Sequence, residues 1–113
     1  MAENIVFKSN ILFLKSGITI PFQHNITELM IFPEVIIVRL DIPYKVLFNE
    51  NVYGISHNGN LLWQIPKIDH VYQDSPYTGM KIMNNELILC NWDGLDVTID
   101  PITGNILKTS YGK

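Results

Sequence analysis

The sequence predicts an all-β fold, an antiparallel meander or sandwich of about eight to ten short strands with little helix. Three observations favour this class. Short apolar runs that alternate with polar residues follow one another along the chain, and Gly, Asn and Pro residues separate them. The strand-forming residues Ile, Val, Tyr, Phe and Thr are abundant, as a pleated and half-buried surface prefers. A strand–turn–strand layout at 51–65 also returns at 97–109.

The alternating runs and the turn residues between them place the individual elements. We expect strands near 3–8, 10–15, 17–22, 34–41, 51–56, 60–65, 79–84, 86–92, 95–99 and 105–110. Turns are expected at 57–60, 83–86, 92–94 and 100–104. Asn84-Asn85 predicts a tight hairpin, because Asn tolerates positive φ. Residues 66–78 are expected to form the main connecting loop.

Only one segment carries a helix signal. The run "NITELMIF" at 25–32 predicts one or two helical turns, with Asn25 as the N-cap. Glu28 stands at the third position after Asn25 and would complete a capping box. Pro33 would then end the helix, because proline lacks the backbone N–H that a helix interior needs.

The chain contains an internal repeat. The segments "EVIIVRLD" at 34–41 and "ELILCNWD" at 86–93 match at their Glu, Ile and Asp residues. Each is followed by a second strand, a glycine turn and a last strand, so each copy is interpreted as a three-stranded antiparallel meander. We therefore expect one domain over 1–113, with repeat 1 at 34–65 and repeat 2 at 79–110. Residues 1–33 lack the pattern and are expected to supply strands that cover an open edge.

The second copy, "ELILCNWDGLDVTIDPITGNIL", resembles the blade repeat of quinoprotein-like β-propellers of the pyrroloquinoline-quinone type. In that repeat a strand, an Asp-Gly turn, an alternating strand, an Asp-x-x-Thr-Gly turn and a last strand ending in Trp follow one another. The residues that fill these places are Asp93, Gly94, Asp100, Thr103 and Gly104 in the second copy, and Gly59 and Trp63 in the first. The sequence departs from the pattern at His57, Asn58 and Lys108.

The resemblance implies that Asp binds free N–H groups of its turn and that Trp63 packs between neighbouring units. A propeller closes only with about four to eight blades, so two copies would need either self-assembly into a ring or a small standalone fold. We favour the standalone fold. Quinone binding does not carry over, because that ligand occupies a closed propeller's channel and its contact residues have no counterpart in this sequence.

Charge and composition narrow the function classes. The 113 residues carry eleven acidic and eight basic side chains, a net charge of −3, and no cluster of Lys or Arg. This pattern argues against direct nucleic-acid binding, which needs clustered positive charge. Lys8 and Lys15 interrupt the apolar N-terminal region, so we expect no membrane span. The single cysteine, Cys90, fits a reducing compartment, and a cytoplasmic location is expected.

Residues that could carry chemistry do not form a recognisable constellation. His24, His57 and His70 lie in expected loops or at strand ends, without the spacing of metal ligands. Cys90 follows an apolar run inside a strand and is expected to be a buried, inert thiol. The spacing of Asp93, Asp96 and Asp100 differs from that of a calcium loop. The sequence therefore predicts a protein that is not an enzyme and that holds neither a cofactor nor a metal.

Aromatic and acidic residues gather in the two longest connections, 42–51 and 66–78. Tyrosine offers contact area at low entropy cost, and carboxylates bind Arg or Lys through charge-assisted hydrogen bonds. The predicted partner-binding residues are Asp41, Tyr44, Phe48, Glu50, Asp69, Tyr72, Asp74 and Tyr77. An equally weighted interpretation is that these tyrosines only cover the core while the acids solvate the loops.

The function that the sequence favours is a non-enzymatic protein-binding module. Its most specific form is a small bacterial immunity-type inhibitor that neutralises a basic toxin domain, such as a nuclease, without binding nucleic acid or membrane. The small size, the mild acidity and the tyrosine and acid residues in the loops favour it. One alternative is a blade-like unit that forms a homo-oligomeric propeller. Another is a hydrolase or small-ligand binder whose histidines converge in space.

Overall fold

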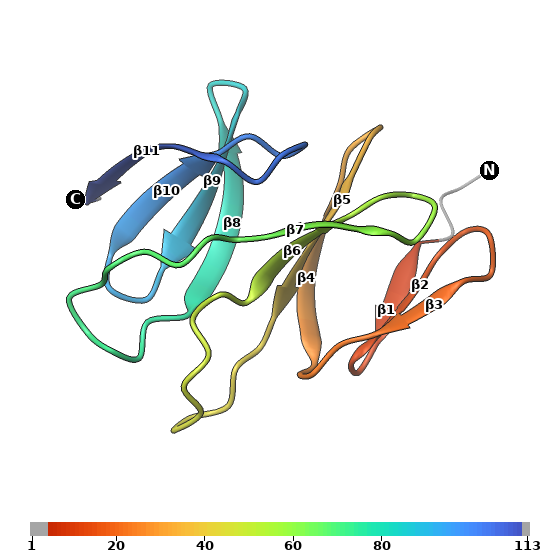
Figure 1. The fold of residues 1–113 in the computed structure, drawn as a ribbon, viewed down its shortest axis with the longest axis horizontal. Helices are drawn as coiled ribbons and strands as arrows, with labels where there is room; N and C mark the ends of the chain where they lie inside the picture. Colours follow the sequence, from red (N-terminus) through yellow and green to blue (C-terminus); the bar gives the residue numbers. More distant parts are fainter. Residues whose placement is uncertain (1–4, 112–113) are drawn as a thin grey trace.

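The computed structural model describes residues 5–111, which form three antiparallel sheets and no helix (Figure 1). The N-terminal sheet contains β1 (Val6–Lys8), β2 (Ile11–Phe13) and β3 (Thr19–Pro21). The central sheet contains β4 (Ile26–Ile31), β5 (Ile36–Leu40), β6 (Val52–Ile55) and β7 (Leu61–Gln64). The C-terminal sheet contains β8 (Tyr77–Met83), β9 (Glu86–Asn91), β10 (Leu95–Ile99) and β11 (Ile106–Tyr111).

The all-β prediction is confirmed, with eleven strands in place of about eight to ten. Residues 3 and 4, which belonged to the first expected strand, lie outside the described residues. Asn84 and Asn85 have φ values of 53° and 65° and form the predicted tight hairpin between β8 and β9. Within 5–111, no helix is long and apolar enough to cross a membrane.

Each sheet is a simple meander, because strands that are neighbours in the sequence are also neighbours in the sheet. The three sheets follow one another across Figure 1 in the order of the chain, with the central sheet between the other two. Two hydrophobic clusters fill the two interfaces of this stack. The longest dimension of the molecule, 41 Å, is in keeping with three layers at about 10 Å spacing.

Strand β5 contributes to both clusters. Val35, just before it, and Ile37 pack toward the C-terminal sheet, while Ile36, Val38 and Leu40 pack toward the N-terminal sheet. All five side chains are fully buried. This position explains why residues 35–38 are all apolar, since a strand covered on both faces needs apolar side chains toward both layers. Arg39 follows this run and is only partly buried.

The expected helix at 25–32 is wrong, because this segment forms β4. Its apolar side chains divide between the two clusters, with Leu29 on one side and Met30 on the other. Glu28, expected in a capping box, instead accepts a hydrogen bond of 2.8 Å from Arg39 on the adjacent β5. Pro33 lies in the hairpin turn after β4, where its fixed φ suits the first central position.

This strand also changes the boundaries of the first repeat. The central sheet begins at Ile26 and has four strands, so the expected start at residue 34 and the count of three strands are wrong. The C-terminal sheet likewise has four strands and begins at Tyr77, two residues before the expected start. Each repeat is therefore a four-stranded meander.

Trp63 joins the central and C-terminal sheets. Its side chain is buried in their shared cluster, and its indole N–H donates a hydrogen bond of 2.9 Å to the carbonyl oxygen of Pro101. A Cβ atom at Gly54, which pairs with Trp63 across β6 and β7, would overlap the indole ring. A Cβ atom at Gly104 would lie 2.5 Å from the ring. The indole therefore needs a glycine on each side, one from each sheet.

We expect Gly104→Ala to destabilise the fold more than Gly17→Ala does. Both glycines have positive φ, 76° and 96°, so both variants carry the roughly 1–2 kcal/mol strain of a left-handed L residue. A Cβ at Gly17 has no neighbour within 4 Å, whereas one at Gly104 meets Trp63. The additional overpacking costs about 1–3 kcal/mol, measurable as the difference in the free energy of unfolding in urea. Equal losses in the two variants would contradict the proposed role of Trp63.

Candidate functional site

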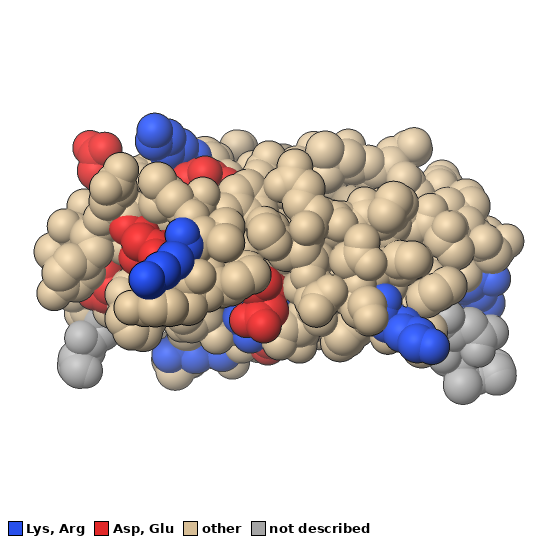
Figure 2. Space-filling model, turned by 90° about the horizontal axis from the view of Figure 1, so that it is seen from below, with Lys and Arg blue, Asp and Glu red and all other residues tan. Residues whose placement is uncertain are grey.

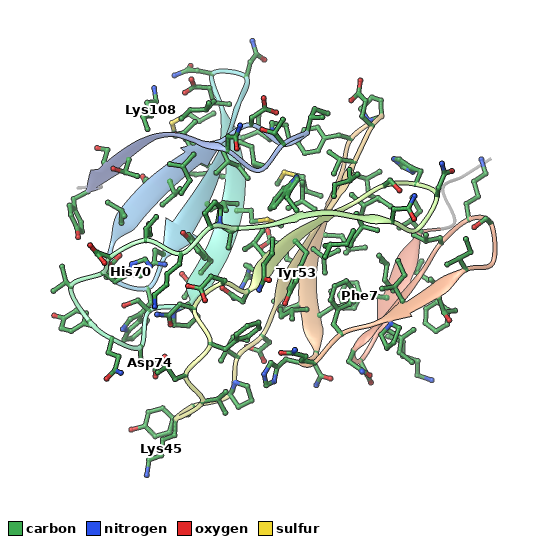
Figure 3. The ribbon with its side chains drawn as sticks, in the orientation of Figure 1. Phe7, Lys45, Tyr53, His70, Asp74 and Lys108 are labelled. Atoms are coloured by element: carbon green, nitrogen blue, oxygen red, sulfur yellow. The ribbon has the colours of Figure 1, made fainter. Side chains whose placement is uncertain are left out.

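Two long connections lie side by side at one end of the molecule (Figure 1). The first, residues 41–51, joins β5 to β6, and the second, residues 65–76, joins β7 to β8. We call the surface formed by these two segments the paired-loop surface. Figure 3 shows Lys45 at the tip of the first segment, and His70 and Asp74 on the second.

Asparagine side chains hold the two connections together. Asn49 donates a hydrogen bond of 2.7 Å from Nδ2 to the carbonyl oxygen of Gln73, and its Oδ1 accepts one of 2.8 Å from the backbone N–H of Ser75. Asn51 accepts a bond of 2.8 Å from the N–H of Tyr77 and donates one of 2.9 Å to the Tyr77 carbonyl. The two side-chain amides thus bind backbone groups of every second residue, 73, 75 and 77, as a neighbouring β-strand would.

The second connection is bound from its other side as well. Asn91 in β9 donates a hydrogen bond of 2.8 Å to the carbonyl oxygen of Ser75. Asn51 also donates one of 2.8 Å to the carbonyl of Leu40 at the end of β5. Asn51, Ser75 and Asn91 are buried, where an unpaired amide would cost about 1–3 kcal/mol. We call the set formed by Asn49, Asn51 and Asn91 the asparagine ladder.

A pocket of about 320 Å³ opens between the two connections. This volume lies at the lower end of the roughly 300–1,000 Å³ of ligand pockets and suits one side chain or a small metabolite. The lining residues are Leu47, Phe48, Asn49, Glu50, Lys67, Ile68, Asp69, His70, Tyr72 and Gln73.

His70 in this pocket is hydrogen-bonded to Asp93, which lies in the turn between β9 and β10. His70 Nδ1 lies 3.0 Å from Asp93 Oδ2, and the two side chains are only 4% and 0% exposed. Burial alone would raise the pKa of Asp93, but hydrogen bonds from the backbone N–H of Leu95, from His70 and from Val71 lower it. Asp93 is therefore an ionised acceptor. The proton of the hydrogen bond between the two side chains belongs to His70 Nδ1, and in that tautomer His70 Nε2 is an acceptor.

The ring of Tyr77 packs against the ring of His70. The two rings meet edge to face with centroids 6.4 Å apart. Burial raises the pKa of Tyr77, and the negative charges of Glu50 and Asp93 raise it further. The hydroxyl of Tyr77 is buried and has no hydrogen-bond partner among residues 5–111.

Acidic side chains gather on part of this end of the molecule. Figure 2, which looks onto it, shows Asp and Glu in the left half and centre of the view, with basic side chains among them. The right-hand part of the view, toward the N-terminal sheet, shows Lys or Arg but no acidic side chain. Within the pocket, Glu50 and Asp69 carry two negative charges against the one positive charge of Lys67.

The structure brings only some of the predicted binding residues together. Phe48, Glu50, Asp69 and Tyr72 line the pocket. Tyr44, which is 89% exposed, and Asp74, which is also exposed, lie on the same two connections. Asp41 borders a different hollow, which Arg39, Pro76 and Thr78 also line. Tyr77 is only 2% exposed and lies in the core, so its prediction as a surface contact is wrong.

Sequence reasoning missed the His70–Asp93 pair and the asparagine ladder. Asp93 was expected to bind its own turn, and its Oδ1 does accept a hydrogen bond from Leu95 N–H. No signal in the sequence links it to His70, 23 positions away. The sequence gives one weak indication of the asparagine ladder. Asn49 and Asn51 are two residues apart, so their side chains can point to the same side of an extended chain.

None of the other candidate residues lines this pocket. His57 donates from Nε2 to the carbonyl oxygen of Phe32 at 2.8 Å, and the ring of His24 contacts Phe48. Cys90 is partly buried in β9, and burial raises the pKa of its thiol, in keeping with low reactivity. Among residues 5–111, no group of three His, Cys, Asp or Glu residues could hold a metal ion.

The fold and this site define an all-β protein built as a stack of three meanders, with a polar pocket between two fixed loops at one end. The chain belongs to the family described as "Domain of unknown function (DUF7957)", whose model matches residues 2–111. Neither the search of curated proteins nor the search of solved structures gives a match.

We expect the stability difference between the parent and Asp93→Asn to depend on pH. The pKa of Asp93 is lowered below its ordinary value of 3.8, so its stabilising contribution is present above that value and is lost as pH falls through the folded-state pKa. The parent should therefore be more stable than the variant at neutral pH, and the gap should narrow below pH 3.8. Urea unfolding at a series of pH values measures the gap, and a constant gap would contradict this role.

Proposed function

We propose that this protein is a binding module that recognises a basic protein partner through the paired-loop surface. In its most specific form, it is an immunity-type inhibitor that blocks a toxin domain. The observation that carries the proposal is an exposed set of aromatic and aliphatic side chains on connections that the asparagine ladder holds in place. A surface held in place before binding loses less conformational entropy when a partner docks.

The exposed side chains of this surface have the composition of an interface. Tyr44 and Tyr72 are 89% and 59% exposed, and Leu47 and Val71 are exposed beside them. Tyrosine is enriched in protein interfaces because it adds a large contact area with only two rotatable side-chain bonds. Isolated exposed apolar residues are common in soluble proteins, so the support lies in their grouping on the paired-loop surface, where Leu47 and Tyr72 also line the pocket.

Charge supports a basic partner. Asp69 and Asp74 are exposed on the second connection, and Glu50 lines the pocket between the two. Carboxylates around an interface speed the approach of a positively charged protein and suppress approach by an acidic one. Such an inhibitor would cover the partner's functional surface by occupying it, and would need no reaction of its own.

We expect the charge reversals Asp69→Lys and Asp74→Lys to slow association with a captured partner by about tenfold at low ionic strength, and by less at physiological salt. The partner is first isolated from a host extract on the immobilised parent protein, then purified and measured by surface plasmon resonance. Its own toxic or enzymatic activity is assayed with and without the parent protein.

Glu34→Lys provides the matched control, because Glu34 is exposed in the β4–β5 hairpin turn at the opposite end of β5 from the first connection. This variant makes the same change in net charge and should associate at the parental rate. Equal slowing in all three variants would mean that the net charge of the protein, and not the position of the carboxylates, sets the association rate. A partner that is acidic, or whose activity the parent protein leaves unchanged, would contradict the proposed function.

The homo-oligomeric propeller is a weaker candidate. The outer face of the C-terminal sheet carries the ion pairs Lys81–Asp96 at 3.9 Å and Lys108–Glu86 at 3.3 Å. A head-to-tail ring would have to bury these charges against the N-terminal sheet of the next copy, at a desolvation cost that few contacts offset. Lys108 also stands where the resemblance would require an apolar tryptophan.

A hydrolase is the second candidate, and the His70–Asp93 pair favours it. A carboxylate that binds Nδ1 leaves Nε2 free to act as a general base, and His70 lines the pocket. The pocket lining contains no Ser, Thr or Cys, so water would have to be the nucleophile. Hydrolysis of ester or phosphodiester reporters by the parent and its loss in His70→Asn would favour this candidate over the inhibitor.

A further inference from the structure

We propose that the pocket between the two connections receives an arginine side chain of the protein partner, whose guanidinium binds the acidic lining and Nε2 of His70. This inference rests on the proposed function and names the contact at the centre of the paired-loop surface.

His70 has one ring nitrogen that no group of residues 5–111 occupies. Its side chain is 96% buried, it lines the pocket, and Asp93 occupies Nδ1 as an acceptor. Nε2 has no hydrogen-bond partner among residues 5–111. On the imidazole ring the two nitrogens point away from each other, so Nε2 faces away from Asp93. In the tautomer that donates from Nδ1 to Asp93, Nε2 is a fixed acceptor that a ligand N–H group can satisfy.

The charged side chains of the lining favour a cationic ligand. Glu50 and Asp69 contribute two carboxylates to the lining and Lys67 contributes one ammonium group, which leaves one net negative charge. No hydrogen bond from another side chain occupies the carboxylate oxygens of Glu50 or Asp69 within residues 5–111. A ligand that carries several donors and one positive charge matches this set. Arginine fits it well because its planar group offers five N–H donors.

The aromatic residues and the volume of the pocket favour a flat cation. Phe48 and Tyr72 contribute aromatic rings to the pocket, one from each connection. A guanidinium is weakly hydrated and packs against aromatic faces, whereas a lysine ammonium is compact and strongly hydrated. The pocket volume of about 320 Å³ also accommodates the flat group together with part of its aliphatic stem. These features favour arginine over lysine.

The test uses Nα-acetyl-arginine amide as the probe, titrated into the ¹⁵N-labelled protein. We expect saturable shifts of His70 Nε2 and of the Glu50 and Tyr72 amides, with a dissociation constant on the order of 1 mM for so small a ligand. The citrulline analogue, which has the same shape without the charge, should bind at least about tenfold more weakly, because charge-assisted hydrogen bonds are the stronger ones. The lysine analogue should fall between the two.

Glu50→Gln should weaken arginine binding by about tenfold. Glu34→Gln, which removes the same charge from the β4–β5 turn, should leave it unchanged. Equal binding of arginine and citrulline, a His70 Nε2 resonance that does not move, or equal effects of the two variants would each overturn the proposal.

The outcome separates this inference from the proposed function. If the arginine probe fails while Asp69→Lys and Asp74→Lys still slow partner association, the pocket contact is wrong and the binding surface stands. If the probe binds as expected and no partner is inhibited, the pocket is an arginine site and the inhibitor function is wrong. If both succeed, Glu50→Gln should weaken the partner complex and replacing one arginine of the partner should have the same effect.

Discussion

The hydrogen bonds of the asparagine ladder are the constraint on which the candidate site depends. Residues 73–76 lie outside the sheets and lead into β8, yet the backbone groups of Ser75, and of Tyr77 at the start of β8, are buried and must be satisfied. Asn49 and Asn51 supply both a donor and an acceptor, as a neighbouring strand would, and Asn91 binds the other side. Because Asn51 also binds Leu40, the same amide ties the second loop to the end of β5 in the central sheet.

This arrangement separates the tasks of packing and recognition within a small chain. The stack of three sheets buries its apolar residues in two clusters. Trp63 connects the central and C-terminal sheets, and its indole ring fits because Gly54 and Gly104 have no Cβ atoms. Each loop anchors itself in one cluster, through Ile42 and Phe48 or through Ile65 and Ile68, and polar contacts bind the two loops to each other. They can therefore expose Tyr44 and Tyr72 without weakening the core, which is how many binding proteins place recognition residues on a rigid scaffold.

The sequence predicted the strands well where local pattern decides structure, as in the alternating runs and the Asn84-Asn85 hairpin. The prediction failed at β4, because residues 25–28 have the pattern of a helix N-terminus. The strand is explained by the two clusters on either side of it, since Leu29 packs into one and Met30 into the other. Four of the predicted binding residues share one pocket. Tyr77 could not be distinguished from a surface tyrosine, and the His70–Asp93 contact depends on tertiary folding that no local pattern encodes.

The central claim is that asparagine side chains hold the two loops as one preformed surface. Amide hydrogen exchange at Ser75 and Tyr77, followed by NMR, tests it most directly. The account predicts protection close to that of Val97 in the core strand β10, and loss of protection at Ser75 but not at Val97 in Asn49→Ala. Exchange of Ser75 and Tyr77 in the parent at the rate of an unstructured peptide would contradict it.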